Sequence, residues 1–145
     1  MYLVVVRVRP LNAREIARGT SVIVKMEGNQ TILTPPGGSG TTRTPERPRV
    51  FSYDHSYWSF DKKDPHYGIP LVLYAEANGK ANQQRVYDDL GANLLNHSFE
   101  GYNTCIFAYG QTGSGKSYSM MGYGEEKGII PRICMNLFER MYFLP

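Results

Sequence analysis

The feature that most constrains this chain is a glycine-rich octapeptide at residues 110–117, Gly-Gln-Thr-Gly-Ser-Gly-Lys-Ser. It matches the pattern Gly-x-x-x-x-Gly-Lys-Ser/Thr of a phosphate-binding P-loop. It follows an apolar, strand-like segment and opens a helix, as the pattern requires. Such a match arises by chance in about one per cent or fewer of chains this long. The octapeptide therefore predicts a site for a nucleoside triphosphate, with ATP favoured.

Each residue type in this loop has a physical reason. Gly110, Gly113 and Gly115 allow backbone turns that are closed to other residues and let the backbone approach phosphates closely. Successive N–H groups and the following helix N-terminus then surround the anion. Lys116 supplies a mobile charge for the β- and γ-phosphates, and the Ser117 hydroxyl is a ligand for Mg²⁺. The predicted nucleotide-binding loop is Gly110, Gln111, Thr112, Gly113, Ser114, Gly115, Lys116 and Ser117.

Composition sets weaker bounds on the chain. Its 145 residues fit one domain, and a net charge of +3 permits an acidic partner without demanding one. No long basic run supports nucleic-acid binding, and no stretch is long enough for membrane insertion. Cys105 and Cys134 lie in apolar stretches, which favours buried, reduced thiols over a disulfide. These features favour a cytoplasmic protein.

The first third of the chain reads as strands and turns. A β-branched run at 3–9 predicts a buried strand that Pro10 stops, with a helical or loop segment after it. Segments 21–26 and 30–34 flank Glu27-Gly28-Asn29 and predict a hairpin. Residues 35–48 are typical of a surface loop, and 49–58 are strand-like.

The second half alternates helix and strand. Apolar residues recur at helical spacing over 83–99, with Gly101 as a stop signal. Residues 103–108 predict a strand that is apolar on both faces, as in the centre of a parallel sheet. After a loop at 122–128, a second apolar stripe predicts another helix: Ile129, Ile130, Ile133, Leu137, Phe138 and Met141. This alternation predicts an α/β fold.

The sequence around the octapeptide resembles a known family. Residues 99–122, from Phe-Glu-Gly-Tyr-Asn to Ser-Met-Met-Gly, resemble the P-loop block of kinesin motor domains. Val5-Val6-Arg7-Val8-Arg9-Pro10-Leu11-Asn12 is similar to the kinesin first strand. Phe51-Ser52-Tyr53-Asp54, Val86-Tyr87 and Gly128-Ile129-Ile130-Pro131-Arg132 fit in the same order. Ser56-Tyr57-Trp58 and Lys116-Ser117-Tyr118-Ser119-Met120-Met121 favour the kinesin-3 branch, the Unc-104-like vesicle transporters.

The resemblance implies a three-layer P-loop α/β fold and an ATP-driven microtubule motor that binds ATP, ADP and Mg²⁺. It implies tubulin as the partner, a cytoskeletal location, and contact with cargo vesicles only through a tail that these residues do not include. In kinesins an Arg-x-Arg-Pro segment and a tyrosine before the P-loop line the adenine pocket. Here those residues are Arg7, Arg9, Pro10 and Tyr87, whose planar groups can stack on a purine. Tyr118 is a weaker candidate for contact near the nucleotide.

Two departures from the family qualify this expectation. The resemblance makes residues 1–145 the N-terminal part of a motor domain, and the sequence contains no switch I motif (Asn-x-x-Ser-Ser-Arg-Ser-His). No switch II motif (Asp-x-x-Gly) follows the P-loop, since the one match to that pattern, Asp88-Asp89-Leu90-Gly91, precedes it. No catalytic residue is therefore predicted in the chain. The alternative is a non-motor fragment that binds nucleotide weakly or not at all and has no ATPase activity. A GTPase is disfavoured because no guanine-reading Asn/Thr-Lys-x-Asp motif occurs.

The second departure is an insertion at residues 68–81, where the family moves quickly into the helix. It contains an apolar run, Ile69-Pro70-Leu71-Val72-Leu73-Tyr74. Its codons can contain the donor, branch and acceptor signals of a retained intron, and the last five residues can be read-through from a second donor. An ordinary lineage-specific loop is the alternative.

Overall fold

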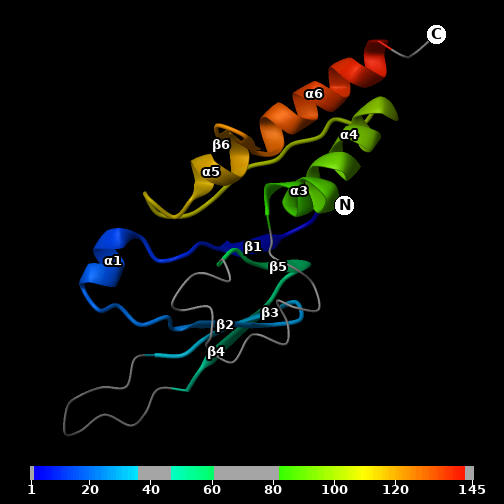
Figure 1. The fold of residues 1–145 in the computed structure, drawn as a ribbon. Coiled ribbons are helices and arrows are strands. Elements are labelled where there is room, and N and C mark those ends of the chain that lie inside the picture. Colours follow the sequence, from blue (N-terminus) through cyan, green and yellow to red (C-terminus); the bar gives the residue numbers. More distant parts are fainter. Residues whose placement is uncertain (1, 36–46, 61–81, 143–145) are drawn as a thin grey trace, which may run out of the picture. The chain divides into compact units, whose positions relative to one another are not determined.

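The computed structural model describes residues 2–35, 47–60 and 82–142 (Figure 1). The chain divides into two compact units, residues 1–80 and 81–145. The insertion at 68–81 and most of the loop at 35–48 lie outside the described residues. None of the described helices combines the length and the apolar composition that a bilayer crossing needs.

A parallel pair of strands positions the Arg-x-Arg-Pro segment in the first unit. Strand β1 (Val5–Val8) pairs with β5 (His55–Trp58), and Arg7 stands opposite Tyr57. The predicted strand at 3–9 is thereby confirmed, although its residues are half-buried. Helix α1 (Ala13–Ala17) follows and begins at a capping box, in which the Asn12 side chain accepts from two backbone N–H groups, those of Arg14 and Glu15.

The predicted hairpin is the start of a three-stranded antiparallel sheet. Strands β2 (Val24–Glu27) and β3 (Gln30–Leu33) are joined by a two-residue turn, and Gly28 at its first position has φ +59°. A glycine at this position allows the turn to match the strand twist. Strand β4 (Arg49–Ser52) adds to β3, so the strand-like stretch 49–58 forms two strands in different sheets.

The core of the first unit lies between these sheets. Met26, Trp58 and Phe60 are buried and form one cluster, in which the rings of Trp58 and Phe60 stack with centroids 4.3 Å apart. Half-buried valines of β1, of β2 and of the segment just before β2 pack around them: Val6, Val8, Val22 and Val24. Burial of these side chains is the main force that holds the first unit together.

The second unit begins with the predicted helix over 83–99. It has three parts: α3 (Gln83–Val86), a π-helical turn η1 (Tyr87–Gly91) and α4 (Ala92–Phe99). The predicted stop is confirmed, since Gly101 has φ +89°. The π turn was not predicted, because apolar spacing does not distinguish it from an α turn.

The P-loop leads into a short helix, a hairpin and a long helix. Helix α5 (Lys116–Met120) is followed by strands β6 (Gly122–Tyr123) and β7 (Glu126–Lys127), where the sequence indicated a loop. Helix α6 (Ile129–Tyr142) confirms the second predicted helix and runs beside α4 (Figure 1). The Arg140 guanidinium lies over the Phe99 ring, 5.6 Å from its centroid, and ties these two helices.

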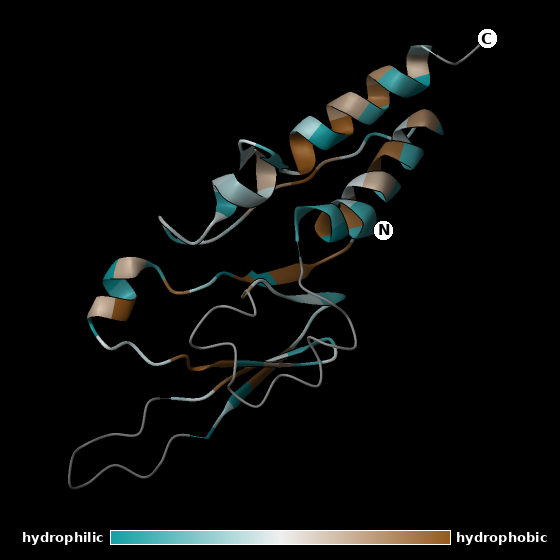
Figure 2. Cartoon of the chain, viewed as in Figure 1, coloured by the Kyte–Doolittle hydropathy of each residue, from teal (hydrophilic) through white to brown (hydrophobic). Residues whose placement is uncertain are grey.

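The predicted strand at 103–108 is not formed in the structure. Residues 102–110 carry no strand, and the side chains of Phe107 and Tyr109 are 84% and 98% exposed. Figure 2 shows this segment as a trace between α4 and α5. A central strand needs hydrogen-bonded neighbours, and no described strand pairs with this segment.

Two expectations about the burial of side chains were also wrong, because the described residues do not cover them. Cys105 and Cys134 are free thiols, as predicted, but both are exposed rather than buried. The stripe on α6 is only partly covered: Ile129 is buried, whereas Phe138 and Met141 are exposed. An apolar stripe predicts a contact face, but it does not specify what covers that face.

Candidate nucleotide-binding site

The P-loop adopts the backbone turns that its glycines make possible. Gly110, Gly113 and Gly115 have φ values of +149°, +81° and +98°, which side chains rarely tolerate. A Cβ atom on Gly110 would lie 2.6 Å from the Ser114 hydroxyl oxygen, so the loop is closely folded there. The Ser114 N–H donates to the Gln111 carbonyl over 3.1 Å and closes the central turn.

The Lys116 side chain folds back over the beginning of this loop. Its ammonium donates to the carbonyls of Gly110 and Gln111 at 2.6 and 2.9 Å. The positive charge therefore lies over the loop, held by neutral carbonyl oxygens. No side chain among the described residues caps the helix that Lys116 begins, and Gly115 is its N-cap.

Ser117 is the second residue of α5 and is exposed. Its carbonyl accepts from the Met121 N–H at 2.8 Å, which closes the last turn of this helix. Thr112 is also exposed, at the tip of the loop. The structure thus brings the eight predicted residues of the loop together as one turn and helix start.

Tyr118 points away from the loop and into the hairpin that follows α5. Its hydroxyl donates to the Glu126 carboxylate, and its ring stacks on Tyr123 with centroids 6.1 Å apart. The buried Gln83 side chain contacts the same place, since its amide donates to the Tyr118 carbonyl at 2.6 Å. Sequence reasoning missed Gln83, and its first position in a helix carried no signal of this long-range contact.

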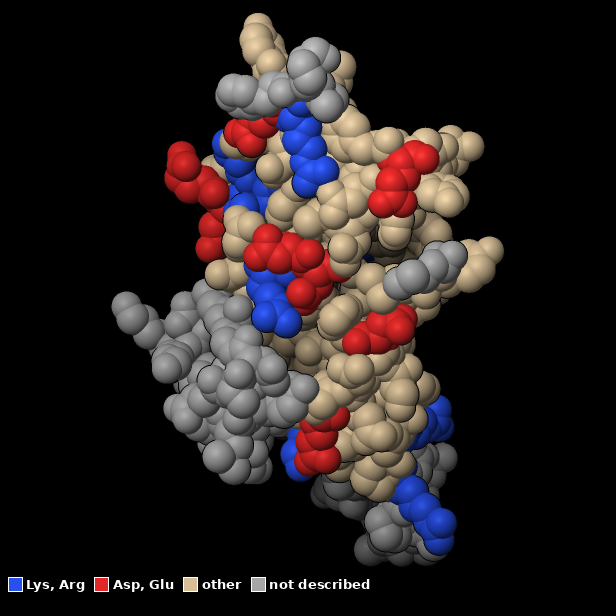
Figure 3. All heavy atoms as spheres, turned by 90° about the vertical axis from the view of Figure 1, so that its right-hand side faces the viewer, with Lys and Arg blue, Asp and Glu red and all other residues tan. Residues whose placement is uncertain are grey.

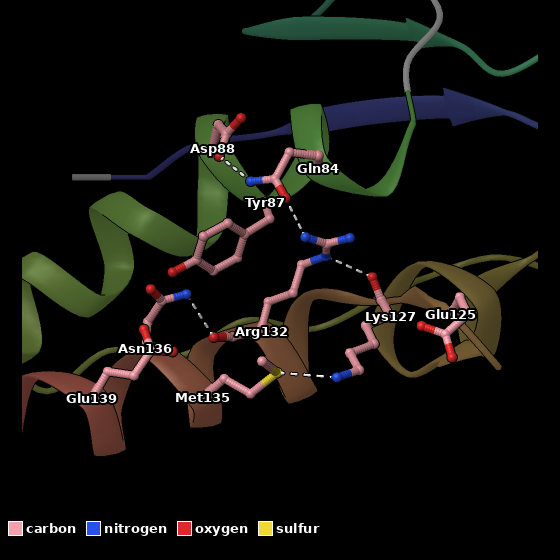
Figure 4. Close-up of a pocket in the computed structure, with 9 residues that line it drawn as sticks. All are labelled: Gln84, Tyr87, Asp88, Glu125, Lys127, Arg132, Met135, Asn136 and Glu139. Atoms are coloured by element: carbon pink, nitrogen blue, oxygen red, sulfur yellow. Dashed lines mark hydrogen bonds between the residues drawn. The ribbon is translucent and has the colours of Figure 1, made fainter.

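Tyr87 lies between its own helix and α6. Its side chain is 6% exposed, and burial raises the pKa of its hydroxyl. The residue lines a hollow of about 560 Å³ together with residues of the hairpin and α6, among them Lys127 and Arg132 (Figure 4). None of residues 110–117 lines this hollow.

Arg132 holds the two sides of that hollow together. Its guanidinium donates to the Gln84 side chain across the helices and to the Lys127 carbonyl at 2.7 Å (Figure 4). The Asn136 amide donates to the Arg132 carbonyl at 3.0 Å, within α6. These bonds join α6 to α3 and to strand β7.

Arg7, Arg9 and Pro10 belong to the first unit. Arg7 donates from Nε to the Ser59 hydroxyl at 2.8 Å. Arg9 makes two parallel hydrogen bonds to the Glu15 carboxylate at 2.7 and 2.8 Å, and a third to the Pro10 carbonyl. The hydrogen bonds from Arg9 lower the pKa of Glu15 from 4.5 to about 2, with the backbone N–H of Asn12 adding to the effect.

Glu15 is a residue that sequence reasoning had not assigned to the site. The spacing Asn12-x-x-Glu15 is a capping-box signal, so its place at the start of α1 could have been predicted. Its pairing with Arg9 depends on how the chain turns at Pro10, which the spacing does not reveal.

Charged side chains of both signs are interspersed on the surface. On the face shown in Figure 3, most Lys and Arg side chains lie next to Asp or Glu side chains. Three ion pairs carry this pattern in the described parts of the chain: Arg9–Glu15, Lys25–Glu27 and Arg85–Asp89.

Comparison with known proteins places the chain in a family. The family model of the kinesin motor domain matches residues 7–143. The chain is 49% identical to kinesin-related protein 1 of Dictyostelium discoideum over 146 residues, which cover 98% of the chain and 6% of that protein. It is 46% identical to the kinesin-like protein unc-104 of Caenorhabditis elegans, covering 95% of the chain and 8% of that protein.

The fold is similar to solved kinesin structures. A structure of KIF14 with ADP in complex with a microtubule matches with a TM-score of 0.78 and 44% identity, over 98% of this chain and 34% of that one. The chain therefore spans about a third of that structure, and less than a tenth of the two relatives above. These matches confirm the α/β kinesin fold and the Unc-104-like branch that the sequence favoured. The chain belongs to the kinesin motor domain family.

Proposed function

We propose that residues 1–145 form the nucleotide-binding, N-terminal part of an ATP-driven microtubule motor domain. The observation that carries this proposal is the P-loop itself. Three glycines with positive φ angles fold it, and Lys116 places its ammonium over it. The family membership and the ADP named in the KIF14 structure support the same reading.

The residues present fit a nucleotide phosphate. Backbone N–H groups at a glycine-rich turn that opens a helix form an anion site. Lys116 already lies within reach of that turn and would exchange its two carbonyl partners for phosphate oxygens. Ser117, exposed beside it, would hold Mg²⁺ through its hydroxyl. The bound Mg²⁺ would supply positive charge against the phosphate oxygens.

Arg7, Arg9, Pro10 and Tyr87 are the proposed contacts of the adenine ring. Arg9 uses the edge of its guanidinium for Glu15, which leaves the flat faces of that group suited to stacking on a purine. Tyr118, the weaker candidate for a contact near the nucleotide, is proposed to act there by holding the end of the P-loop helix. Its hydroxyl and ring are engaged with Glu126 and Tyr123.

Tubulin is the proposed partner, and the microtubule cytoskeleton the proposed location. Two KIF14 structures that match the chain are complexes with microtubules. Vesicle cargo would bind through other parts of the protein. Steady-state ATPase measurements on a motor domain containing this chain test the proposal: polymerised tubulin should stimulate the parent and leave Lys116→Ala inactive. Equal turnover by the parent and Lys116→Ala would refute the site.

The rival function is a nucleotide-binding fragment without motor activity. It is favoured because the 145 residues contain no switch I motif and no Asp-x-x-Gly after the P-loop, whereas hydrolysis needs groups that polarise the γ-phosphate and place a water. A polypeptide of residues 1–145 should therefore show no tubulin-stimulated phosphate release and similar affinity for ATP and ADP. Stimulation comparable to that of a complete kinesin motor domain would contradict this expectation.

A further inference from the structure

We propose that Gln83 is a positioning residue of the nucleotide site, which holds the P-loop helix α5 in place from the neighbouring helix α3. This inference rests on the proposed function of the P-loop, and it adds a residue outside the loop that sets the loop's affinity. The contact joins residues 35 positions apart in the sequence.

The Gln83 side chain is buried and bonded to two parts of the backbone. It is 4% exposed, and its amide nitrogen donates to the Tyr118 carbonyl at 2.6 Å. The same nitrogen contacts the Glu126 carbonyl at 3.4 Å. A side-chain amide carries two N–H donors, so it can serve both carbonyls. Gln83 thus joins α3 to the last turn of α5 and to strand β7.

A third contact closes this arrangement. The Tyr118 hydroxyl donates to the carboxylate of Glu126, whose carbonyl faces Gln83. Gln83 therefore contacts the backbone carbonyls of both Tyr118 and Glu126. The side chains of these two residues are in turn bonded to each other. Hydrogen bonds that are connected in this way fix the geometry more strongly than separate bonds.

Gln83 itself is held in a defined position. It is the first residue of α3, and the Asn82 side chain caps that helix by accepting from the Arg85 N–H at 2.8 Å. The Val86 N–H donates to the Asn82 carbonyl at 3.2 Å. The amide of Gln83 is therefore aimed from the fixed end of a helix.

The position of α5 determines where the phosphate ligands stand. Tyr118 follows Lys116 and Ser117 directly, and all three lie on one five-residue helix. Gly115, with φ +98°, precedes them and allows the helix to pivot when its far end is released. Loss of the Gln83 bond would let Lys116 and Ser117 move together. Misplacement of binding groups by about 1 Å can cost up to about 100-fold in function.

The test compares two glutamines of α3 in a motor domain that contains this chain. Gln83→Met keeps the length of the side chain and removes its donors. Gln84→Met is the matched control, because it removes a bond between α3 and α6 that does not involve α5. The measured quantities are the Kd for Mg-ADP, from a fluorescent ADP analogue, and the melting temperature of each variant. The Kd of each variant is measured at a temperature below its melting temperature, at which it is folded.

We expect Gln83→Met to raise the Kd for Mg-ADP about tenfold or more, and Gln84→Met to leave it within about twofold of the parent. If Gln83→Met does not fold, Gln83→Glu replaces it, since a carboxylate of the same length cannot donate. A parent-like Kd in the Gln83 variant would overturn the inference, and so would an equal rise in both variants. A parent that does not bind Mg-ADP would instead refute the proposed function.

Discussion

The ring of Tyr87 occupies the space where a side chain at Gly91 would stand. A Cβ atom added to Gly91 would lie 2.5 Å from the Cδ2 and 2.8 Å from the Cε2 of that ring. Ile129 of α6 lies 3.5 Å from the same point. The π-helical turn from Tyr87 to Gly91 therefore depends on a glycine for its packing against α6, and not for an unusual φ angle.

Gly91→Ala should destabilise the second unit, although alanine is the better helix former. The propensity gain is about 1 kcal/mol, whereas overpacking against a buried ring costs about 1–3 kcal/mol. We expect a net loss in the free energy of unfolding of about 1 kcal/mol, measured by urea unfolding of a protein containing this chain. Asn93→Ala, on the exposed side of α4, is the control and should cost less than about 0.5 kcal/mol. A Gly91→Ala variant more stable than the parent would show that the ring moves freely.

Glu15 should titrate far below an ordinary glutamate. Its pKa is lowered from 4.5 to about 2 by the hydrogen bonds from Arg9. Because the folded protein favours the ionised form, this pair stabilises the fold fully above about pH 4.5 and progressively less as the pH falls to about 2. NMR titration of the Glu15 carboxyl group measures the midpoint directly.

The matching variant is Arg9→Met, which should move that midpoint upward toward 4.5. Arg14→Met, on the exposed side of α1, should leave it where it is in the parent. A midpoint near 4.5 in the parent protein would mean that Arg9 and Glu15 are not paired in solution.

Cys105 provides a test of the segment that did not form a strand. In a polypeptide of residues 1–145, both Cys105 and Cys134 are exposed and should react with a thiol reagent at the rate of a small free thiol. In a longer motor domain, Cys105 should react at least about tenfold more slowly, since sheet neighbours on both sides would bury its strand. Mass spectrometry of each labelled cysteine gives the two rates. Equal rates for Cys105 in both proteins would show that residues 103–108 remain outside the sheet.

The sequence predicted those parts of the fold that depend on local interactions. The turn at Gly28, the helix over 83–99 and the P-loop each follow from residues close together in the chain. The strand at 103–108 failed because strand formation depends on neighbours that come from elsewhere. The exposure of the two cysteines and of part of the apolar stripe on α6 has the same cause, because burial also depends on neighbours from elsewhere.

The candidate site shows the same division. Lys116 and the loop glycines were predicted from a motif whose residues act together over eight positions. The contacts of Gln83 with Tyr118, and of Arg9 with Glu15, join residues through the fold and had no sequence signal of their own. The adenine contacts, which combine residues from both units, remain predictions.

The central claim, that this P-loop holds a nucleotide through Lys116, is tested most directly by Mg-ADP binding. Isothermal titration of a motor domain containing this chain compares the parent with Lys116→Ala and with Lys127→Ala, a lysine on β7 outside the loop. Loss of a charged hydrogen bond of about 1.5–3 kcal/mol predicts a Kd about 10- to 150-fold higher for Lys116→Ala. Lys127→Ala should bind like the parent. Parent-like binding by Lys116→Ala, or no binding by the parent, would contradict the account.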